Sequence, residues 1–270
     1  MLAEPPVGAL PHEERSNGCF ETMRAYEGRI FRLEAHLDRL EASATSLGTM
    51  ISMSRAELAR RLKAALARSG IQEAVVRVAM IPSPKGPAQP HIVVQPIQLL
   101  PAAAYRRGIR VAVVPARKFS VGSIDPRAKY SARLGSVMAV TDAQLRGVDE
   151  ALFMDAMGSV TESTASNFGI VARGEILTPP CWLGLLAGIT RDVLFEAAGM
   201  AHRLIREAPL TRHDIYNAQE AFMTSTLKEV LPVTMVDGRT IGTGRPGPVT
   251  RRLRQAFREV VRRELRAGSK

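Results

Sequence analysis

The chain has 270 residues, 46% of them hydrophobic and 23% charged, which suits one or two domains with buried cores and excludes wholesale disorder. The formal net charge is +11 at pH 7. Much of the excess lies in arginines interleaved with apolar residues at helical spacing, which is typical of a solvated helix face. No nucleic-acid-binding motif accompanies them, so we expect no nucleic-acid partner. These arginines are Arg251, Arg252, Arg254, Arg258, Arg262, Arg263 and Arg266.

The two cysteines, Cys19 and Cys181, form neither a metal-binding spacing nor a disulfide framework. Their scarcity predicts a reducing compartment, a cytoplasmic location and no bound metal. The N-terminus lacks the basic and apolar pattern of a secretory signal, and no apolar run reaches the length of a membrane span. We therefore expect no membrane partner.

In chain order, the first part of the sequence predicts a small domain of strands and helices. A strand at Cys19–Tyr26 is followed by a Glu-Gly turn and a hairpin partner. Of two helices, the first ends at Gly48; the second begins at Ser54, with a capping box to Glu57, and ends at Gly70. The other predicted elements are the hairpin strand Arg29–Leu33, the first helix Glu34–Leu47, the strands Ala74–Ile81, His91–Leu99 and Arg110–Val114, and a Pro/Gly-rich loop Pro82–Pro90.

The second part follows a linker-like segment and predicts a larger domain. Strands and helices mix without strict βαβ alternation, which predicts an α+β protein of two domains. We expect a small N-terminal domain at 1–117, a linker at 118–128 and a larger C-terminal domain at 129–270. The predicted elements are helices Ala132–Arg146, Thr190–Ala198 and Pro248–Arg266, strands Glu150–Asp155, Asn167–Arg173 and Ala221–Thr224, and a loop after Thr224.

Three polar segments follow Lys129, which lies at the predicted mouth of a helix. A Schiff-base lysine must reach an aldehyde and shuttle protons, but a lysine taken alone is an ordinary surface residue. Thr161–Asn167 places one acid, Glu162, among small hydroxylic residues, which suits either a cofactor site or a solvated turn.

Two further segments suit a phosphate group. Gly188 opens a helix whose N-terminal N–H groups and Thr190 hydroxyl would cradle a phosphate, although Thr190 is equally an ordinary N-cap. Thr224–Thr226 is a second hydroxylic cluster that could hold the same group.

Together these segments resemble the class IV (fold-type IV) enzymes that depend on pyridoxal 5′-phosphate (PLP): branched-chain aminotransferase, D-amino-acid aminotransferase and 4-amino-4-deoxychorismate lyase. The matching stretches are Gly18–Gly48, Lys129–Gly199 and Ala221–Arg252, in the family's order. The resemblance implies a two-domain α+β fold like that of D-amino-acid aminotransferase, PLP as the cofactor, and a homodimer.

The resemblance also implies a role for each matching residue. Lys129 matches the Schiff-base lysine, Glu162 the carboxylate that bonds the protonated pyridine nitrogen, and Arg39 the phosphate-binding arginine. The other matches are Asn167, which closes the Glu162 segment; Leu185 on the ring face; Ile189 and Thr190 under the phosphate; Ser225 and Thr226 in the hydroxylic loop; and Phe20 on the aromatic wall of the substrate pocket.

The sequence departs from the family in three places. Ser16–Gly18 replaces the usual Gly-Asp-Gly turn. The loop that carries a carboxylate-binding Arg and His in D-specific members has neither here, and its Lys85 is a candidate anion contact or a solvated loop lysine. Arg133 resembles the lyase, but the lyase's neighbouring Asn is missing.

The resemblance implies a ping-pong transaminase that moves an amino group between an amino acid and a 2-oxo acid. The alternative is 4-amino-4-deoxychorismate lyase, which eliminates pyruvate to give 4-aminobenzoate. The runs TSTLKEVLPV and PGPVTRR look more like those of aminotransferases, so we favour the transaminase. The presence of Lys129, Glu162 and Arg39 argues against a non-enzymatic, nucleic-acid-binding protein. The amino donor and the preference for L or D substrates stay open.

Overall fold

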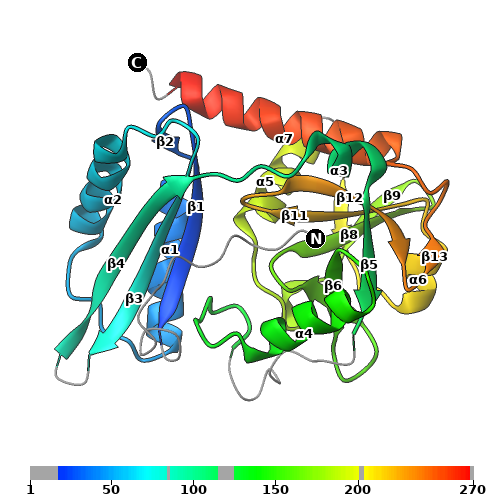
Figure 1. Cartoon of the computed structure of the whole chain (residues 1–270), viewed down its shortest axis with the longest axis horizontal. Coiled ribbons are helices and arrows are strands. Elements are labelled where there is room, and N and C mark those ends of the chain that lie inside the picture. The colour runs from blue at the N-terminus through cyan, green and yellow to red at the C-terminus, as the bar shows by residue number, and fades with distance from the viewer. Residues whose placement is uncertain (1–17, 84–85, 115–124, 201–203, 268–270) are drawn as a thin grey trace. The chain divides into compact units, whose positions relative to one another are not determined.

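The computed structural model describes residues 18–83, 86–114, 125–200 and 204–267 (Figure 1). These residues form two compact units. The small unit comprises the described residues of 18–99, 127–133 and 261–267, and the large unit comprises those of 100–126 and 134–260.

This division differs from the predicted domain boundaries. Residues 100–114 join the large unit because they include a strand, β5 (Ile109–Val113), that pairs with two other strands of that unit. Residues 127–133 join the small unit because the main chain around Lys129 pairs with the first strand. Residues 118–124 of the predicted linker lie outside the described residues.

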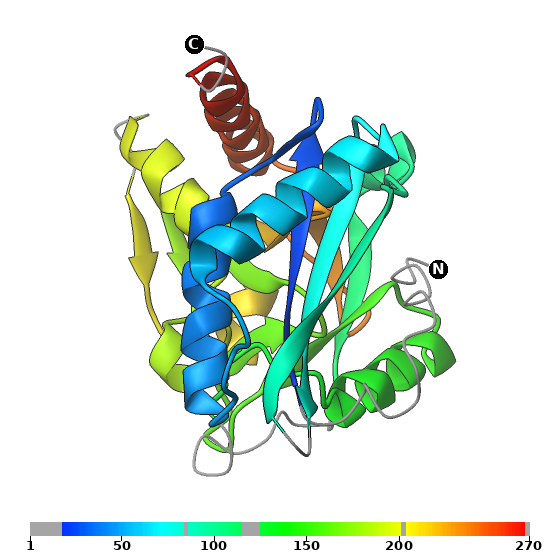
Figure 2. The same cartoon turned by 90° about the vertical axis from the view of Figure 1, so that its left-hand side faces the viewer.

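The small unit is an antiparallel sheet with helices on one face (Figure 2). Its strand order is β2-β1-β3-β4, and residues Ala74 through Met80 of β3 alternate so that every second side chain joins the core under the helices. Two rows of leucines from the helices complete that core. The elements are β1 (Cys19–Tyr26), β2 (Arg29–Ile30), α1 (Leu33–Ser46), α2 (Arg55–Ser69), β3 (Ala74–Ser83) and β4 (Gly86–Pro96).

The ends of α2 are those expected from the sequence, with one difference. The Ser54 hydroxyl accepts the Glu57 N–H at 3.3 Å, and Gly70 adopts a left-handed φ of 67° that suits glycine. The Glu57 carboxylate, however, pairs with Arg60 and Arg61. The N-cap is therefore confirmed, whereas the reciprocal half of the predicted capping box is replaced by surface ion pairs.

The predicted loop Pro82–Pro90 is wrong for most of its length. The strand β3 continues to Ser83, β4 begins at Gly86, and these two residues pair with each other. Because β4 is the edge strand of the sheet, one of its sides makes no ladder hydrogen bonds, and Pro87 and Pro90 are tolerated there.

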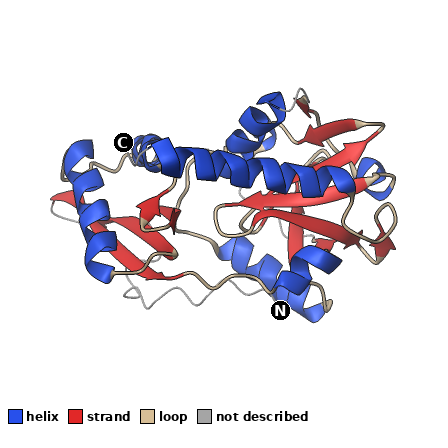
Figure 3. Cartoon of the chain, turned by 90° about the horizontal axis from the view of Figure 1, so that it is seen from above, coloured by secondary structure: helices blue, strands red, loops and turns tan. Residues whose placement is uncertain are grey.

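The large unit contains a nine-stranded sheet that closes on itself (Figure 3). The path β8-β11-β12-β5-β6-β7 returns to β8, because Glu162 of β7 pairs with Asn167 of β8. Its apolar core includes Phe168, Ile170 and Leu231. Besides β5, the elements are α3 (Ala102–Arg107), α4 (Leu134–Leu145), β6 (Glu150–Met154), β7 (Val160–Ser163), β8 (Asn167–Ala172), β9 (Glu175–Thr178), a short 3₁₀ turn (Cys181–Leu183), α5 (Ile189–Met200), β10 (Ile205–Glu207), α6 (Arg212–Tyr216), β11 (Glu220–Ser225), β12 (Glu229–Val236) and β13 (Arg239–Thr240). The helix α7 (Pro248–Ala267) belongs to the large unit up to Val260 and to the small unit from Val261.

The segment after Thr224, predicted as a loop, contains the buried strand β12. Its Pro232 hides the strand in the sequence, because proline lacks the N–H that a central strand donates. In the structure, pairing with β5 begins only at Val233, one residue after the proline. The proline pairs with Phe222 of β11 on one side, and on the other side it lies where pairing with β5 has not yet begun.

The pairing registers bring three segments to the same end of the closed sheet. Ser163, the last residue of β7, pairs with Leu152 of β6, two residues after Glu150, and Asn167 pairs with Thr224 near the end of β11. The β7–β8 turn, the β11–β12 turn and Glu150 at the start of β6 therefore lie close together. This end of the large unit carries most of its predicted site residues.

Candidate active site

Lys129 is held in the small unit through its main chain. Its carbonyl accepts the Phe20 N–H at 3.0 Å, its N–H donates to the Ser43 hydroxyl at 2.9 Å, and the following Ser131 N–H donates to Gly18 at 2.7 Å. The segment is thus extended along the start of β1. The predicted position at the mouth of a helix is wrong, because α4 begins only at Leu134. Lys129 Nζ lies 4.9 Å from the centroid of the Phe20 ring.

Arg39 is fixed by a buried carboxylate that the sequence did not single out. Its Nε and one terminal nitrogen donate to the two oxygens of Glu21, at 2.7 and 2.8 Å. This bidentate geometry is the strong form of an arginine–carboxylate pair. The fork uses one edge of the guanidinium, and the arginine side chain retains 12% exposure.

His36 completes this cluster. Its Nδ1 lies 2.7 Å from the second oxygen of Glu21, and both side chains are almost fully buried. Burial opposes ionisation of Glu21, but the Arg39 charge and the hydrogen bonds from Arg39 and His36 outweigh it and lower the Glu21 pKa to about 2. Burial lowers the His36 pKa despite the Glu21 carboxylate. An ionised Glu21 carboxylate can only accept hydrogen bonds. We therefore place a proton on His36 Nδ1, which donates the hydrogen bond to Glu21.

The substrate-pocket candidates of the small unit lie near Lys129. Phe20 is buried, and the guanidinium carbon of Arg77 lies 4.4 Å from its ring centroid. Arg133 is half-buried, and its charge acts on Tyr130, the residue after Lys129. Lys85 lies outside the described residues.

In the large unit, Glu162 is oriented by two N–H groups. Its Oε2 accepts the Asn167 side-chain amide at 3.3 Å and the Leu186 backbone N–H at 3.2 Å. The same Asn167 amide also donates to the Leu186 carbonyl at 2.8 Å. Asn167 therefore ties the carboxylate to the segment that leads into α5, as its predicted place beside Glu162 required.

The N-terminus of α5 approaches this amide closely. A Cβ at Gly188 would lie 1.9 Å from the Asn167 side-chain oxygen, so only glycine fits without displacing the amide. Leu185, Ile189 and Thr190 are all buried around this helix start. The structure therefore brings these three predicted residues together with Glu162 and Asn167.

The hydroxylic residues at the same end have unused hydrogen-bonding capacity. Among the described residues, Ser163, Ser166 and Thr224 carry buried hydroxyl oxygens with no hydrogen-bond partner. Such groups are rare in proteins and are satisfied by a bound water, ion or ligand. Ser225 and Thr226 are half-buried in the adjoining turn. Buried hydroxyls and a helix N-terminus fit an anion with several acceptor oxygens, such as the phosphate of PLP.

The comparisons with known proteins decide the family. The model for amino-transferase class IV matches residues 18–236. The chain belongs to the class IV aminotransferases. It is 35% identical over 251 residues, covering 90% of this chain and 87% of the relative, to a putative branched-chain-amino-acid aminotransferase of Methanocaldococcus jannaschii. A branched-chain-amino-acid aminotransferase of Pseudomonas aeruginosa is 34% identical, with coverage of 90% and 84%.

Solved structures agree with this assignment. A branched-chain amino acid aminotransferase from T.th., with pyridoxamine 5′-phosphate, has a TM-score of 0.88 and 31% identity, covering 94% of this chain and 90% of that one. The predicted family, α+β fold, PLP cofactor and transaminase activity are confirmed. The class IV aminotransferase moves an amino group between an amino acid and a 2-oxo acid, and the lyase alternative is not favoured.

Sequence reasoning missed several residues that support the candidate site. Glu21, His36 and Ser43 support Arg39 and Lys129. A signal for Glu21 was present, because it alternates with Cys19 and Met23 on one face of β1, and both of these are fully buried. A carboxylate between two core side chains of a strand must have a partner.

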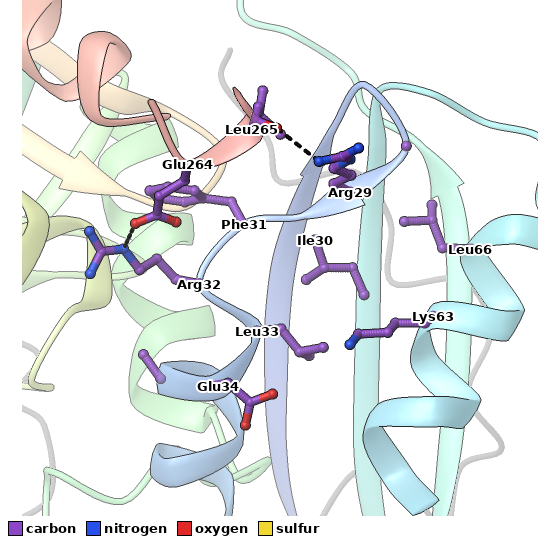
Figure 4. Close-up of a pocket in the computed structure, with 12 residues that line it drawn as sticks. Arg29, Ile30, Phe31, Arg32, Leu33, Glu34, Lys63, Leu66, Glu264 and Leu265 are labelled. Atoms are coloured by element: carbon purple, nitrogen blue, oxygen red, sulfur yellow. Dashed lines mark hydrogen bonds and ion pairs between the residues drawn. The ribbon is translucent and has the colours of Figure 1, made fainter. Parts of the chain in front are cut away.

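The small unit also contains a cavity of about 690 Å³, which none of the candidate site residues lines (Figure 4). It is lined by the segment from Gly28 to Ala35 and by side chains of α2 and α7. Arg29 donates to the Leu265 carbonyl at 2.8 Å, and Arg32 pairs with Glu264 at 2.5 Å.

In the described part of the chain, no group of three or more His, Cys, Asp or Glu side chains could hold a metal ion, and no helix could cross a membrane.

We predict that Glu21→Gln removes a component of acid sensitivity. Since the Glu21 pKa of about 2 lies below the ordinary 4.5, its ionised form stabilises the fold above pH 4.5 and loses this effect as pH falls toward 2. At pH 7 the variant should have an unfolding free energy about 3–5 kcal/mol below that of the wild type, because Arg39 loses its buried partner. Urea unfolding should show this difference between wild type and variant narrowing between pH 5 and pH 3.

Glu57→Gln is the matched control, since Glu57 pairs with arginines on the surface of α2. Exposed pairs contribute little, so this variant should unfold almost as the wild type does at every pH. A Glu21→Gln deficit that stays constant from pH 7 to pH 3 would contradict the assignment of an ionised, buried Glu21.

We predict that Gly188→Ala perturbs the Glu162 carboxylate. The new methyl group must push the Asn167 amide away, at a cost of about 1–3 kcal/mol for overpacking, and Glu162 loses one of its donors. The affinity for PLP, measured by equilibrium dialysis, should fall. Gly199→Ala in the same helix is the control, because a Cβ there meets nothing within 4 Å; equal PLP affinities in the two variants would refute the prediction.

Proposed function

We propose that this enzyme is a branched-chain aminotransferase that transfers the amino group of an aliphatic L-amino acid to 2-oxoglutarate. The observation that carries the proposal is the match, over about nine-tenths of the chain, to relatives named branched-chain-amino-acid aminotransferase. Structures of the T.th. enzyme of that name hold 4-methylvaleric acid or N-(5′-phosphopyridoxyl)-L-glutamate. A Thermoproteus uzoniensis relative holds norvaline. An apolar donor and a glutamate–2-oxoglutarate pair fit these ligands.

In this proposal the residues of the small unit bind the cofactor and transfer the substrate proton. Lys129 would hold PLP through its side-chain amine, and that amine would act as the base that takes the proton from the substrate Cα. Its main chain is fixed to β1 and α1, so only the side chain has to move. Arg39 binds the phosphate through the part of its guanidinium that lies away from the fork to Glu21.

The residues of the large unit orient the ring and hold the phosphate. PLP supplies an electron sink when its pyridine nitrogen is protonated. Glu162 holds that proton in place, and the Asn167 and Leu186 N–H groups fix the carboxylate for this role. Ile189 and Thr190 offer N–H groups at the start of α5, Ser225 and Thr226 offer hydroxyls, and Leu185 packs against the ring. Phe20, Arg133, Lys85 and Thr226 are the proposed substrate contacts.

We also propose that the enzyme is a homodimer associated through α4. This helix buries only Ala139 and Ala143 and exposes large apolar side chains. Contiguous exposed apolar surface of this kind is typical of an interface. A second copy, with the same apolar face, would complete it. The exposed residues of α4 are Leu134, Val137, Met138, Val140 and Leu145.

A cytoplasmic location is part of the proposal. Both cysteines are free, and burial raises the pKa of the Cys19 thiol to about 11, which keeps it protonated at neutral pH. Two thiols without a disulfide suit a reducing compartment.

The decisive assay supplies PLP and follows glutamate formation from 2-oxoglutarate. We expect L-leucine, L-isoleucine and L-valine to be the best donors and D-alanine to be poor. Lys129→Ala should lower kcat by about 10²- to 10⁴-fold or more, because the general base is lost, and should remove the borohydride-reducible adduct. Lys63→Ala, at an exposed position of α2, is the control. Release of pyruvate from aminodeoxychorismate without transamination would support the lyase instead.

For the dimer, we expect Val137→Lys combined with Met138→Lys to produce a monomer in sedimentation velocity. Two like charges in an apolar interface cannot pair with each other, and burying them unpaired disfavours association. Met157→Lys is the control, since Met157 is also highly exposed but lies in a turn outside α4. A double variant that sediments like the wild type would exclude α4 as the interface.

A further inference from the structure

One buried ion pair of the large unit has no part in the roles assigned above. Lys228 Nζ lies 2.9 Å from Glu150 Oε2, and the two side chains are 11% and 6% exposed. The other oxygen of Glu150 accepts the Thr164 hydroxyl at 2.6 Å and the Ala151 N–H at 3.1 Å. Lys228 is therefore neither a surface lysine nor a member of a solvated charge cluster.

These contacts join two turns that are distant in sequence. Lys228 ends the β11–β12 turn, which carries Ser225 and Thr226, and Thr164 lies in the β7–β8 turn, directly between Glu162 and Asn167. Glu150, at the start of β6, receives one hydrogen bond from each turn. We call the set Lys228, Glu150 and Thr164 the bridge.

The main chain of the β11–β12 turn is also fixed at Lys228. The Lys228 N–H donates to the Ser225 hydroxyl at 3.3 Å, and its carbonyl accepts the Tyr105 hydroxyl at 2.9 Å. The next residue, Glu229, has a left-handed φ of 55° and is paired with Arg258 at 2.8 Å. The backbone is thus held on both sides of the position from which the Lys228 side chain leaves.

A buried ion pair contributes little net stability, because desolvation offsets the attraction. A pair placed between two turns instead selects one arrangement of those turns. We propose that Lys228 and Glu150 are positioning residues, which set the Thr226 turn against the Glu162 turn so that the hydroxyls and the carboxylate meet the same cofactor. This rests on the proposed roles of Glu162 and Thr226 as PLP contacts, but not on the identity of the amino donor.

The test compares Lys228→Met with Lys228→Arg in the holoenzyme. Methionine removes the charge at similar length, whereas arginine retains it. We expect Lys228→Met to raise the PLP dissociation constant by about 10- to 100-fold, the range found when a residue that orients a metal ligand is lost. Lys228→Arg should stay within about threefold of the wild type. Equilibrium dialysis against PLP gives the dissociation constant without any amino donor. A donor assay that contradicts the proposed function therefore leaves this test of Lys228 and Glu150 intact.

Two further variants separate positioning from general destabilisation. Glu220→Gln weakens the same unit at the opposite end of β11, where Glu220 accepts the Val249 and Thr250 N–H groups at the start of α7. At equal loss of unfolding free energy, it should leave the PLP dissociation constant unchanged. Thr164→Val keeps the ion pair and removes only the link to the Glu162 turn; it should weaken PLP binding severalfold, and it serves if Lys228→Met does not fold. Equal PLP affinity in Lys228→Met and Lys228→Arg, or a loss matched by Glu220→Gln, would overturn the proposal.

Discussion

The candidate site of the small unit depends on the pairing of the ionised, buried Glu21 carboxylate with Arg39 and His36. A charge with no solvent exposure must be paired, and its partners, His36 and Arg39, lie on one stripe of α1. Ser43 continues that stripe by one turn and accepts the N–H of Lys129. A single helix face therefore fixes both Arg39, the proposed phosphate ligand, and the main chain of Lys129, the proposed Schiff-base lysine.

The same face explains why α1 cannot rotate freely over the sheet. Its leucines at Leu37 and Leu40 are fully buried in the core next to the polar stripe. A rotation that kept the leucines buried would break the fork between Arg39 and Glu21, and one that kept the fork would expose the leucines. The apolar and polar requirements agree on one orientation, which is what specifies a unique structure.

The large unit positions its carboxylate by a different device. Glu162 is oriented by neutral N–H groups, which fix the direction of a carboxylate without neutralising its charge, and this suits a protonated pyridine nitrogen. The closed path of strands brings the two hydroxylic turns to one end of the sheet. The buried pair of Glu150 and Lys228 then connects those turns, so each unit uses a buried carboxylate to support residues that are proposed to contact the cofactor.

Local spacing and short motifs were enough to predict the family, the α+β class and the helices α1, α2 and α7, because that information is carried by neighbouring residues. The PLP contacts that the same motifs indicate stay predictions. They did not reveal β12, since Pro232 is acceptable only where β5 has not yet begun to pair, nor the edge-strand position that admits prolines in β4. They also could not pair Glu21 with Arg39, or Glu150 with Lys228, which lie 18 and 78 residues apart. Those partners are chosen by strand register and by the need to satisfy buried charge, and both exist only once the chain has folded.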